Sequence, residues 1–139
     1  MPANTSPIFM LTPRAVTASI AAANTARDGS GTLVDVMTAG SSGSRVDFLT
    51  FTSAQATAGA SAARVARVFL TDTGGINPRL ISEVVMSAVT ASTTAIGATS
   101  TITFTNGLII ASGQKIQVAQ SVYGSAADQT HVVLRGGDF

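Results

Sequence analysis

Short runs of alternating apolar and polar residues, separated by Gly, Ser, Thr and Asn, make up most of this chain. The clearest pair lies at residues 44–51 (SRVDFLTF) and 64–72 (RVARVFLTD), on either side of a linker rich in Ala, Ser, Thr and Gly. Alternation with a period of two, together with many β-branched and aromatic residues, predicts two strands joined by a surface loop. Within the first strand, Val46 and Phe48 are expected to share one face.

The same pattern predicts further strands along the chain. In order, they lie at residues 15–23, 32–39, 79–88, 101–105, 108–111, 114–123 and 129–135. The alanines of 15–23 favour a helix, but the β character of its neighbours and the lack of a helix stop signal favour a strand. Segment 79–88 also fits helical spacing, but its density of β-branched residues favours a strand. The short GSSG connection at 40–43 predicts a hairpin between 32–39 and 44–51, and Asn106-Gly107 suits a type I′ turn.

Eight to ten short strands without an amphipathic helix between them argue against a parallel sheet with crossover helices. The pattern therefore predicts an all-β fold: a single-domain antiparallel β-sandwich, with a jelly roll as the first choice of topology. We divide the chain into an extended N-terminal arm at residues 1–13 and a β-sandwich domain at residues 14–139.

Three prolines, Pro2, Pro7 and Pro13, exclude a helix from the N-terminal arm. Within the arm, residues 8–11 (IFML) form a short apolar strand. Two interpretations are open. The segment is either an edge strand of the domain's own sheet or an arm that reaches a neighbouring subunit by adding a strand to its sheet.

Charged residues are scarce: they are 11% of the 139 residues, against roughly 25% in typical soluble domains. Such a surface fits either a neutral β domain or a protein covered by partners in an assembly. The net charge of +1 gives no case for nucleic acid or membrane as a partner. The absence of cysteine excludes disulfides and thiolate metal sites. The N-terminus lacks signal-peptide features, so we expect a soluble, non-secreted protein.

Candidate catalytic and metal-binding residues are few. His131, the sole histidine, lies within a predicted strand beside two valines and is interpreted as an ordinary strand residue. Asp28 and Asp72 both lie in predicted turns, and turn formation explains them better than a shared site. Arg45 with Asp47, and Arg64 with Arg67, are interpreted as surface pairs. We therefore expect no enzyme, no catalytic, cofactor-binding or metal-binding residues, no cofactor and no small-molecule substrate.

Three stretches carry a resemblance to a known class of proteins. They are AANTARDGSGT at 22–32, the strands within 43–72, and the terminal GGDF at 136–139. Together they resemble small virion structural proteins of tailed bacteriophages. The resemblance implies a capsid decoration or cement protein, a β-sandwich that binds the outside of the shell and stabilises it. It also implies the major capsid protein as partner, a homo-oligomer (dimer or trimer), and a place on the capsid surface of the virion after synthesis in the host cytoplasm.

For this role we expect partner contacts from the arm, at Ile8, Phe9 and Leu11, and from the turn, at Arg27 and Asp28. Two alternatives remain open. A head–tail completion or tail-tube protein would form a closed ring of fixed copy number. A carbohydrate-binding jelly-roll module would need exposed aromatic residues, for which Tyr123 is the one plausible candidate.

Overall fold

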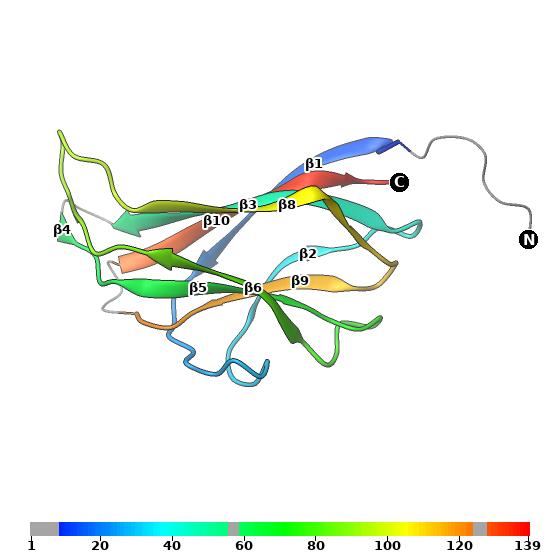
Figure 1. The fold of residues 1–139 in the computed structure, drawn as a ribbon, viewed down its shortest axis with the longest axis horizontal. Coiled ribbons are helices and arrows are strands. Elements are labelled where there is room, and N and C mark those ends of the chain that lie inside the picture. The colour runs from blue at the N-terminus through cyan, green and yellow to red at the C-terminus, as the bar shows by residue number, and fades with distance from the viewer. Residues whose placement is uncertain (1–8, 56–58, 124–127) are drawn as a thin grey trace, which may run out of the picture.

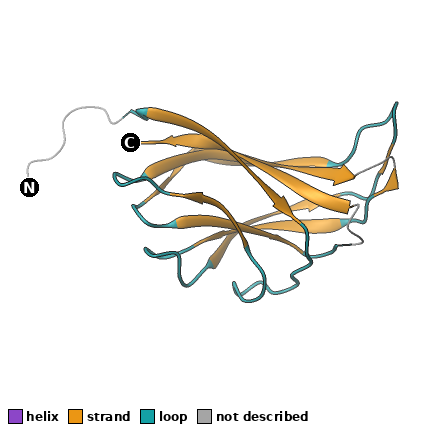
Figure 2. Ribbon diagram, turned by 180° about the vertical axis from the view of Figure 1, so that it is seen from behind, coloured by secondary structure: helices purple, strands orange, loops and turns teal. Residues whose placement is uncertain are grey.

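Two four-stranded antiparallel sheets face each other in the computed structural model, which describes residues 9–55, 59–123 and 128–139 (Figure 1). The described residues contain strands and loops but no helix (Figure 2), and hence none long and apolar enough to cross a bilayer. The predicted all-β sandwich is confirmed. Alternation of apolar and polar side chains gives each strand one face to bury, and packing two sheets together buries both faces.

Sheet I has the order β1-β10-β3-β8, and sheet II has the order β2-β9-β5-β6. The strands of sheet I are β1 (Thr12–Ile20), β10 (Asp128–Asp138), β3 (Ser44–Gln55) and β8 (Thr99–Ile110). Those of sheet II are β2 (Val34–Thr38), β9 (Lys115–Gln120), β5 (Arg64–Leu70) and β6 (Arg79–Met86). A small third sheet pairs β4 (Gly59–Ala60) with β7 (Thr90–Ala91).

The strand order is that of a jelly roll. Strands from the first half of the chain pair with strands from the second half in reverse order: β1 with β10, β2 with β9, β3 with β8, and β5 with β6. The result is one long antiparallel ribbon. Rolling that ribbon adds the pairs β10–β3 and β9–β5 and produces the two sheets. Two four-stranded sheets connected in this way define the topology.

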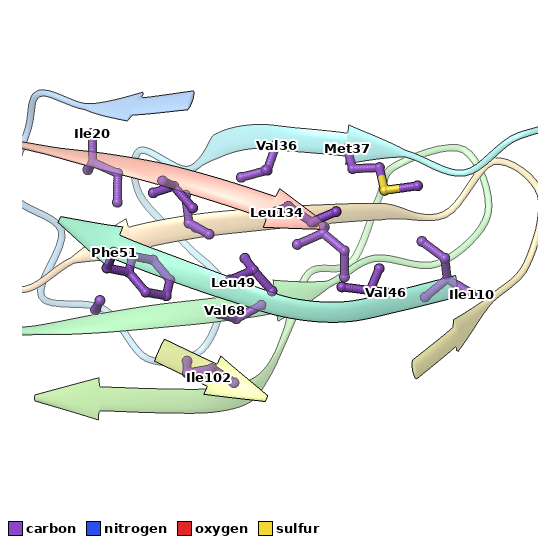
Figure 3. Packing of buried hydrophobic residues seen from close by; sticks show 14 of the residues in the cluster. Ile20, Val36, Met37, Val46, Leu49, Phe51, Val68, Ile102, Ile110 and Leu134 are labelled. Atoms are coloured by element: carbon purple, nitrogen blue, oxygen red, sulfur yellow. The ribbon is translucent and has the colours of Figure 1, made fainter. Parts of the chain in front are cut away.

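The hydrophobic core fills the space between the sheets (Figure 3). Its members come from strands of both sheets, including Val46, Leu49, Phe51, Val68 and Leu134, all with no exposed surface. Burying a side chain of this size contributes about 1.5–3 kcal/mol. Ile20 belongs to this core, and Val16 and Ala18 pack against it, so the second half of β1 is anchored to it.

One predicted face assignment is wrong, because β3 contains a β-bulge. Val46 pairs with Gly136 and Leu108, whereas Phe48 pairs with Arg135 and Thr103, so Asp47 has no partner in either neighbouring strand. The extra residue reverses the alternation. Val46 therefore points into the core, and Phe48 points to the outer face.

Asn106-Gly107 does not form the predicted hairpin turn. Both residues have positive φ, 66° and 76°, as a type I′ turn requires. However, the chain before and after them pairs with the same strand, β3, and residues 104–107 are left out of the register. The dipeptide is thus part of a wide bulge, residues 104–107, inside one long strand and opposite the bulge at Asp47.

The predicted hairpin between 32–39 and 44–51 is also wrong. β2 belongs to sheet II and pairs with β9, while β3 belongs to sheet I. The tight GSSG connection carries the chain from one sheet to the other, with Gly43 at a φ of 87°. The strand predictions at 15–23 and 79–88 are confirmed with shifted ends, whereas the GGD of the tail forms the end of β10.

The close approach of β10 to β3 at the bulge gives a test of this packing. A Cβ at Gly136 would lie 2.0 Å from the carbonyl oxygen of Arg45, whereas a Cβ at Gly59 would meet nothing within 4 Å. We expect Gly136→Ala to lower the free energy of unfolding by about 1–3 kcal/mol. Gly59→Ala is the matched control and should not destabilise the protein. Chemical denaturation measures both, and equal stability of the two variants would contradict the packing.

Candidate functional site

The N-terminal arm carries two of the predicted contact residues, and both face solvent. Phe9 is 72% exposed and Leu11 is 79% exposed. The Leu11 amide donates a hydrogen bond to the Asp138 carbonyl at 2.9 Å, which ties the arm to β10. Residues 9–11 are nevertheless not part of a strand, so the strand predicted at 8–11 is not formed in its described residues. Ile8 lies outside the described residues. A tethered backbone thus presents two large apolar side chains to solvent.

Arg27 and Asp28 lie in loop 21–33, which joins β1 to β2 and runs across the outer side of sheet II (Figure 1). This loop covers the outward-facing part of sheet II, where Phe69 is completely buried although it is not in the core between the sheets. The arm and the loop lie at opposite ends of β1. The structure therefore does not bring the two groups of predicted contacts together.

The buried side chain of Asn24 holds loop 21–33 in shape. Its Nδ2 donates to the carbonyls of Ser30 and Thr32 at 2.9 and 3.0 Å, and its Oδ1 accepts from the amide of Ala26 at 3.0 Å. The backbone amide of Asn24 donates to the backbone carbonyl of Gln120 in β9. These bonds satisfy backbone groups that would otherwise be buried without partners, and they fix the loop to sheet II.

A network of side-chain ion pairs connects loop 21–33 to sheet II. Glu83 accepts from Arg67 Nε at 2.8 Å through one oxygen and from Arg27 at 2.8 Å through the other. The Arg67 side chain is 9% exposed, and that of Arg27 is 65% exposed. The prediction of Arg67 as a surface residue is wrong, because the loop covers it. Arg27 keeps most of its guanidinium in solvent, where a partner can reach it.

Asp28 and Asp72 have turn-forming roles. Asp28 accepts from the amide and the hydroxyl of Ser30, at 3.0 and 2.6 Å. The hydrogen bond from that hydroxyl is the main cause that lowers the pKa of Asp28. Asp72 accepts from the side-chain amide of Asn77 at 3.0 Å. Each carboxylate closes its own turn, as the sequence indicated.

Arg64 and Asp128 form a buried ion pair, which corrects the prediction of Arg64 as a surface residue. Their side chains are 0% and 5% exposed, and the guanidinium meets both carboxylate oxygens at 2.9 Å. Asp128 also accepts from the amide of Ala62 at 3.2 Å. Nearby, buried Thr130 donates to the side-chain oxygen of Gln120. These polar contacts tie the start of β5 and the end of β9 to β10, across the two sheets.

The outer face of sheet I is open and nearly free of charge. The strand registers place its side chains in three rows of four across β1, β10, β3 and β8. These rows are Ala15, Arg135, Phe48 and Thr103; Thr17, Val133, Thr50 and Thr101; and Ser19, His131, Thr52 and Thr99. Ten of these twelve side chains are exposed, and the other two, Phe48 and Thr50, are partly exposed.

This face was not predicted as a site from the sequence. The alternating threonines at 99, 101 and 103 indicated that one strand face is polar and uncharged, but the neighbours of that strand were unknown. A surface hollow of about 440 Å³ adjoins the face at the arm end, between Met10, Phe48 and Arg135. The hollow brings the arm and the open face of sheet I into one continuous surface.

Asp138 joins both sheets beside the arm. It accepts hydrogen bonds from the Ser44 hydroxyl and from Arg14, and Arg14 also donates to the carbonyl of Thr38 in β2 at 3.1 Å. The Ser44 hydroxyl accepts from the amide of Gly40 at 2.9 Å. The hydrogen bond from Ser44, followed by that from Arg14, lowers the pKa of Asp138 below its ordinary value of 3.8. This cluster positions the base of the arm.

The remaining candidate residues do not form a reactive group. His131 is an exposed strand residue on the outer face of sheet I. Arg45 pairs with Asp47 at 2.7 Å, beside the bulge. In the described part of the chain, no three residues among His, Cys, Asp and Glu converge on a metal site.

Comparisons with known proteins identify no family. No family model and no curated protein matches the chain. Solved structures of the Gt and Gx strains of infectious bursal disease virus contain similar chains, at 17% and 18% identity and a TM-score of 0.29 for both. The matches cover 98% of this chain but only 34% and 35% of those chains. A TM-score of this size does not establish a shared fold, so the jelly-roll assignment rests on the strand order alone.

The buried ion pair predicts an unequal effect of charge removal. Asp128→Ala leaves the Arg64 guanidinium buried without its carboxylate, so we expect the free energy of unfolding to fall by about 3–5 kcal/mol. Arg79→Ala removes a solvent-exposed partner of Asp72 and should cost less than about 1 kcal/mol. Denaturant titration measures the free energy of unfolding of both variants. A double variant, Arg64→Leu with Asp128→Ala, should recover part of the loss, and a fully additive loss would contradict a direct pair.

The Asp138 cluster predicts an acid-dependent contribution to stability. Because the folded-state pKa of Asp138 is lowered, its contribution is complete above the unfolded-state pKa of about 3.9 and is lost as pH falls through the folded-state value. Ser44→Ala should raise the pKa of Asp138 toward 3.8. NMR titration of the carboxyl carbons measures it, with Asp35, whose pKa is lowered chiefly by Lys115, as internal control. If the pKa of Asp138 is the same in Ser44→Ala as in the wild type, Ser44 is not the cause of the lowered pKa.

Proposed function

We propose that this protein is a structural component of a bacteriophage virion, a capsid decoration or cement protein that binds the outside of the major capsid shell. It works by contact and has no catalytic activity. The observation that carries the proposal is the open outer face of sheet I, continuous with the exposed arm. Burying such a surface desolvates few charges, and the core of a protein interface is typically depleted of charge.

The mechanism follows from the geometry of the surface. Phe9 and Leu11 are already exposed, so docking them on a shell removes apolar area from water without unfolding the sandwich. Each contact is small, but a shell presents many equivalent sites, and several contacts per oligomer act together. A protein that binds the assembled shell better than free subunits stabilises the shell by mass action. The sequence resemblance described above supports the same role.

A double variant of the arm tests the proposal. Phe9→Ala with Leu11→Ala should weaken binding to mature shells that lack this protein by at least about tenfold, with the thermal midpoint unchanged because both side chains are exposed. Ile96→Ala is the matched control: Ile96 is 89% exposed but lies in the β7–β8 connection, at the opposite end of the sandwich (Figure 1). Co-sedimentation measures all three proteins.

Two results would overturn the proposal. Wild-type protein that fails to sediment with any shell is not a decoration protein. Closed rings of fixed copy number in solution would indicate a head–tail completion or tail-tube protein instead. Equal shell binding by the arm variant and the wild type would remove the arm from the interface and leave the open face of sheet I as the site to vary next.

A further inference from the structure

The sandwich has four edge strands: β1 and β8 in sheet I, and β2 and β6 in sheet II. An edge presents a row of unpaired backbone N–H and C=O groups, which readily pair with another chain. Proteins protect such edges with charged side chains, prolines, bulges or very short strands. Comparing the four edges shows which of them is available to a partner.

Three of the edges carry such protection. β2 has only five residues, a register shift, and the charge of Asp35. β6 carries Arg79 and Glu83 and has a register shift in its pairing with β5. β8 contains the wide bulge at residues 104–107, and its Ser100 hydroxyl donates to the Val85 carbonyl of β6 at 2.8 Å. The edges of β6 and β8 therefore also cover each other in part.

β1 has such protection only at its start, where Pro13 and Arg14 lie and Arg14 donates to the Thr38 carbonyl of β2. From Ala15 to Ile20 it has no charge, no proline and no bulge. Its register with β10 runs from Thr12 to Ile20 without a shift. Beyond Arg14 the sequence contains no charged residue until Arg27, and Pro13 lies at the start of the strand. Among the described residues, the backbone of 15–20 forms hydrogen bonds only with β10. A straight, uncharged edge of this kind is a template for strand addition.

The side chains of β1 also remain incompletely covered. Ala15, Thr17 and Ser19 are exposed on the outer face of sheet I. Val16 and Ala18 pack against the core, yet they are only half-buried because no strand lies beyond them in the sheet. A neighbouring strand would bury the free side of these two apolar residues. The small side chains on both faces allow another backbone to approach closely.

We propose that β1 pairs with β1 of a second copy of this chain, antiparallel about a two-fold axis near Thr17, so that the two sheets I form one continuous eight-stranded sheet. The strand is self-complementary in this arrangement. Ala15 lies opposite Ser19, Val16 opposite Ala18, and Thr17 opposite its own copy, a favourable cross-strand pair. Arg14 lies opposite Ile20, so the two arginines stay apart. A two-fold dimer uses the same patch on both copies, as this one does.

This dimer does not depend on shell binding, and solution measurements test it alone. The interface is one strand wide, so we expect an equilibrium between monomer and dimer that varies with concentration. Analytical ultracentrifugation of the full chain should detect it. Monomeric wild-type protein at every concentration, or a trimer, would overturn the proposal.

A lysine on the edge should block the pairing. Thr17→Lys brings two like charges together at the axis, and we expect it to weaken the dimer at least about tenfold. Thr52→Lys is the matched control: Thr52 is exposed on the same face but lies on the inner strand β3, so dimerisation should persist. Loss of the dimer in both variants would indicate docking through the face of the sheet, and its loss in neither would exclude the β1 edge. Circular dichroism confirms that each variant is folded.

Cross-linking gives an independent measurement, because the chain has no cysteine. Opposed Cα atoms in an antiparallel pair are about 4.5–5.5 Å apart, within the range for a disulfide. Thr17→Cys should therefore form a covalent dimer on mild oxidation, faster than Thr52→Cys at equal concentration. Equal rates for the two variants would overturn the proposed register.

Discussion

The fold depends on the pairing of the first half of the chain with the second half in reverse order. Each strand buries its apolar face only when the opposite sheet is in place, so no hairpin along the chain has a complete core of its own. Phe51 in β3 and Val68 in β5 belong to the same core but to different sheets. This nested pairing sets where every other feature lies, including the arm at one end of β1 and loop 21–33 at the other.

The two outer faces of the sandwich differ in how far the rest of the chain covers them. Loop 21–33 covers sheet II, and the contacts of Asn24 and Arg67 hold it there. The outer face of sheet I remains open, and within its three rows Arg135 is the one permanently charged side chain. The loop therefore has a structural role through its buried residues, even though Arg27 projects from it. The outer face of sheet I stays exposed in the described structure.

Charged residues are scarce, and nearly all of them form ion pairs with other residues of the same chain. Every acidic residue except Asp28 takes part in an ion pair, and Asp28 closes its own turn. Among the basic residues, all but Arg135 are paired within the described structure. Internal pairing leaves a nearly neutral outer surface, and such a surface loses little hydration when a neighbour covers it.

The sequence by itself determined the fold class, most of the strands and the turn-forming residues, because alternation and turn chemistry are local properties. It did not determine strand partners, since backbone hydrogen bonds look alike whichever strands they join. The hairpin expected at 40–43 and the turn expected at Asn106-Gly107 were wrong for this reason. Only the tertiary structure decided that Arg64 and Arg67 are buried, that the bulge at Asp47 turns Phe48 outward, and that threonines from three strands share one face. Each depends on which distant segment lies alongside, and that choice is made by packing the whole core at once.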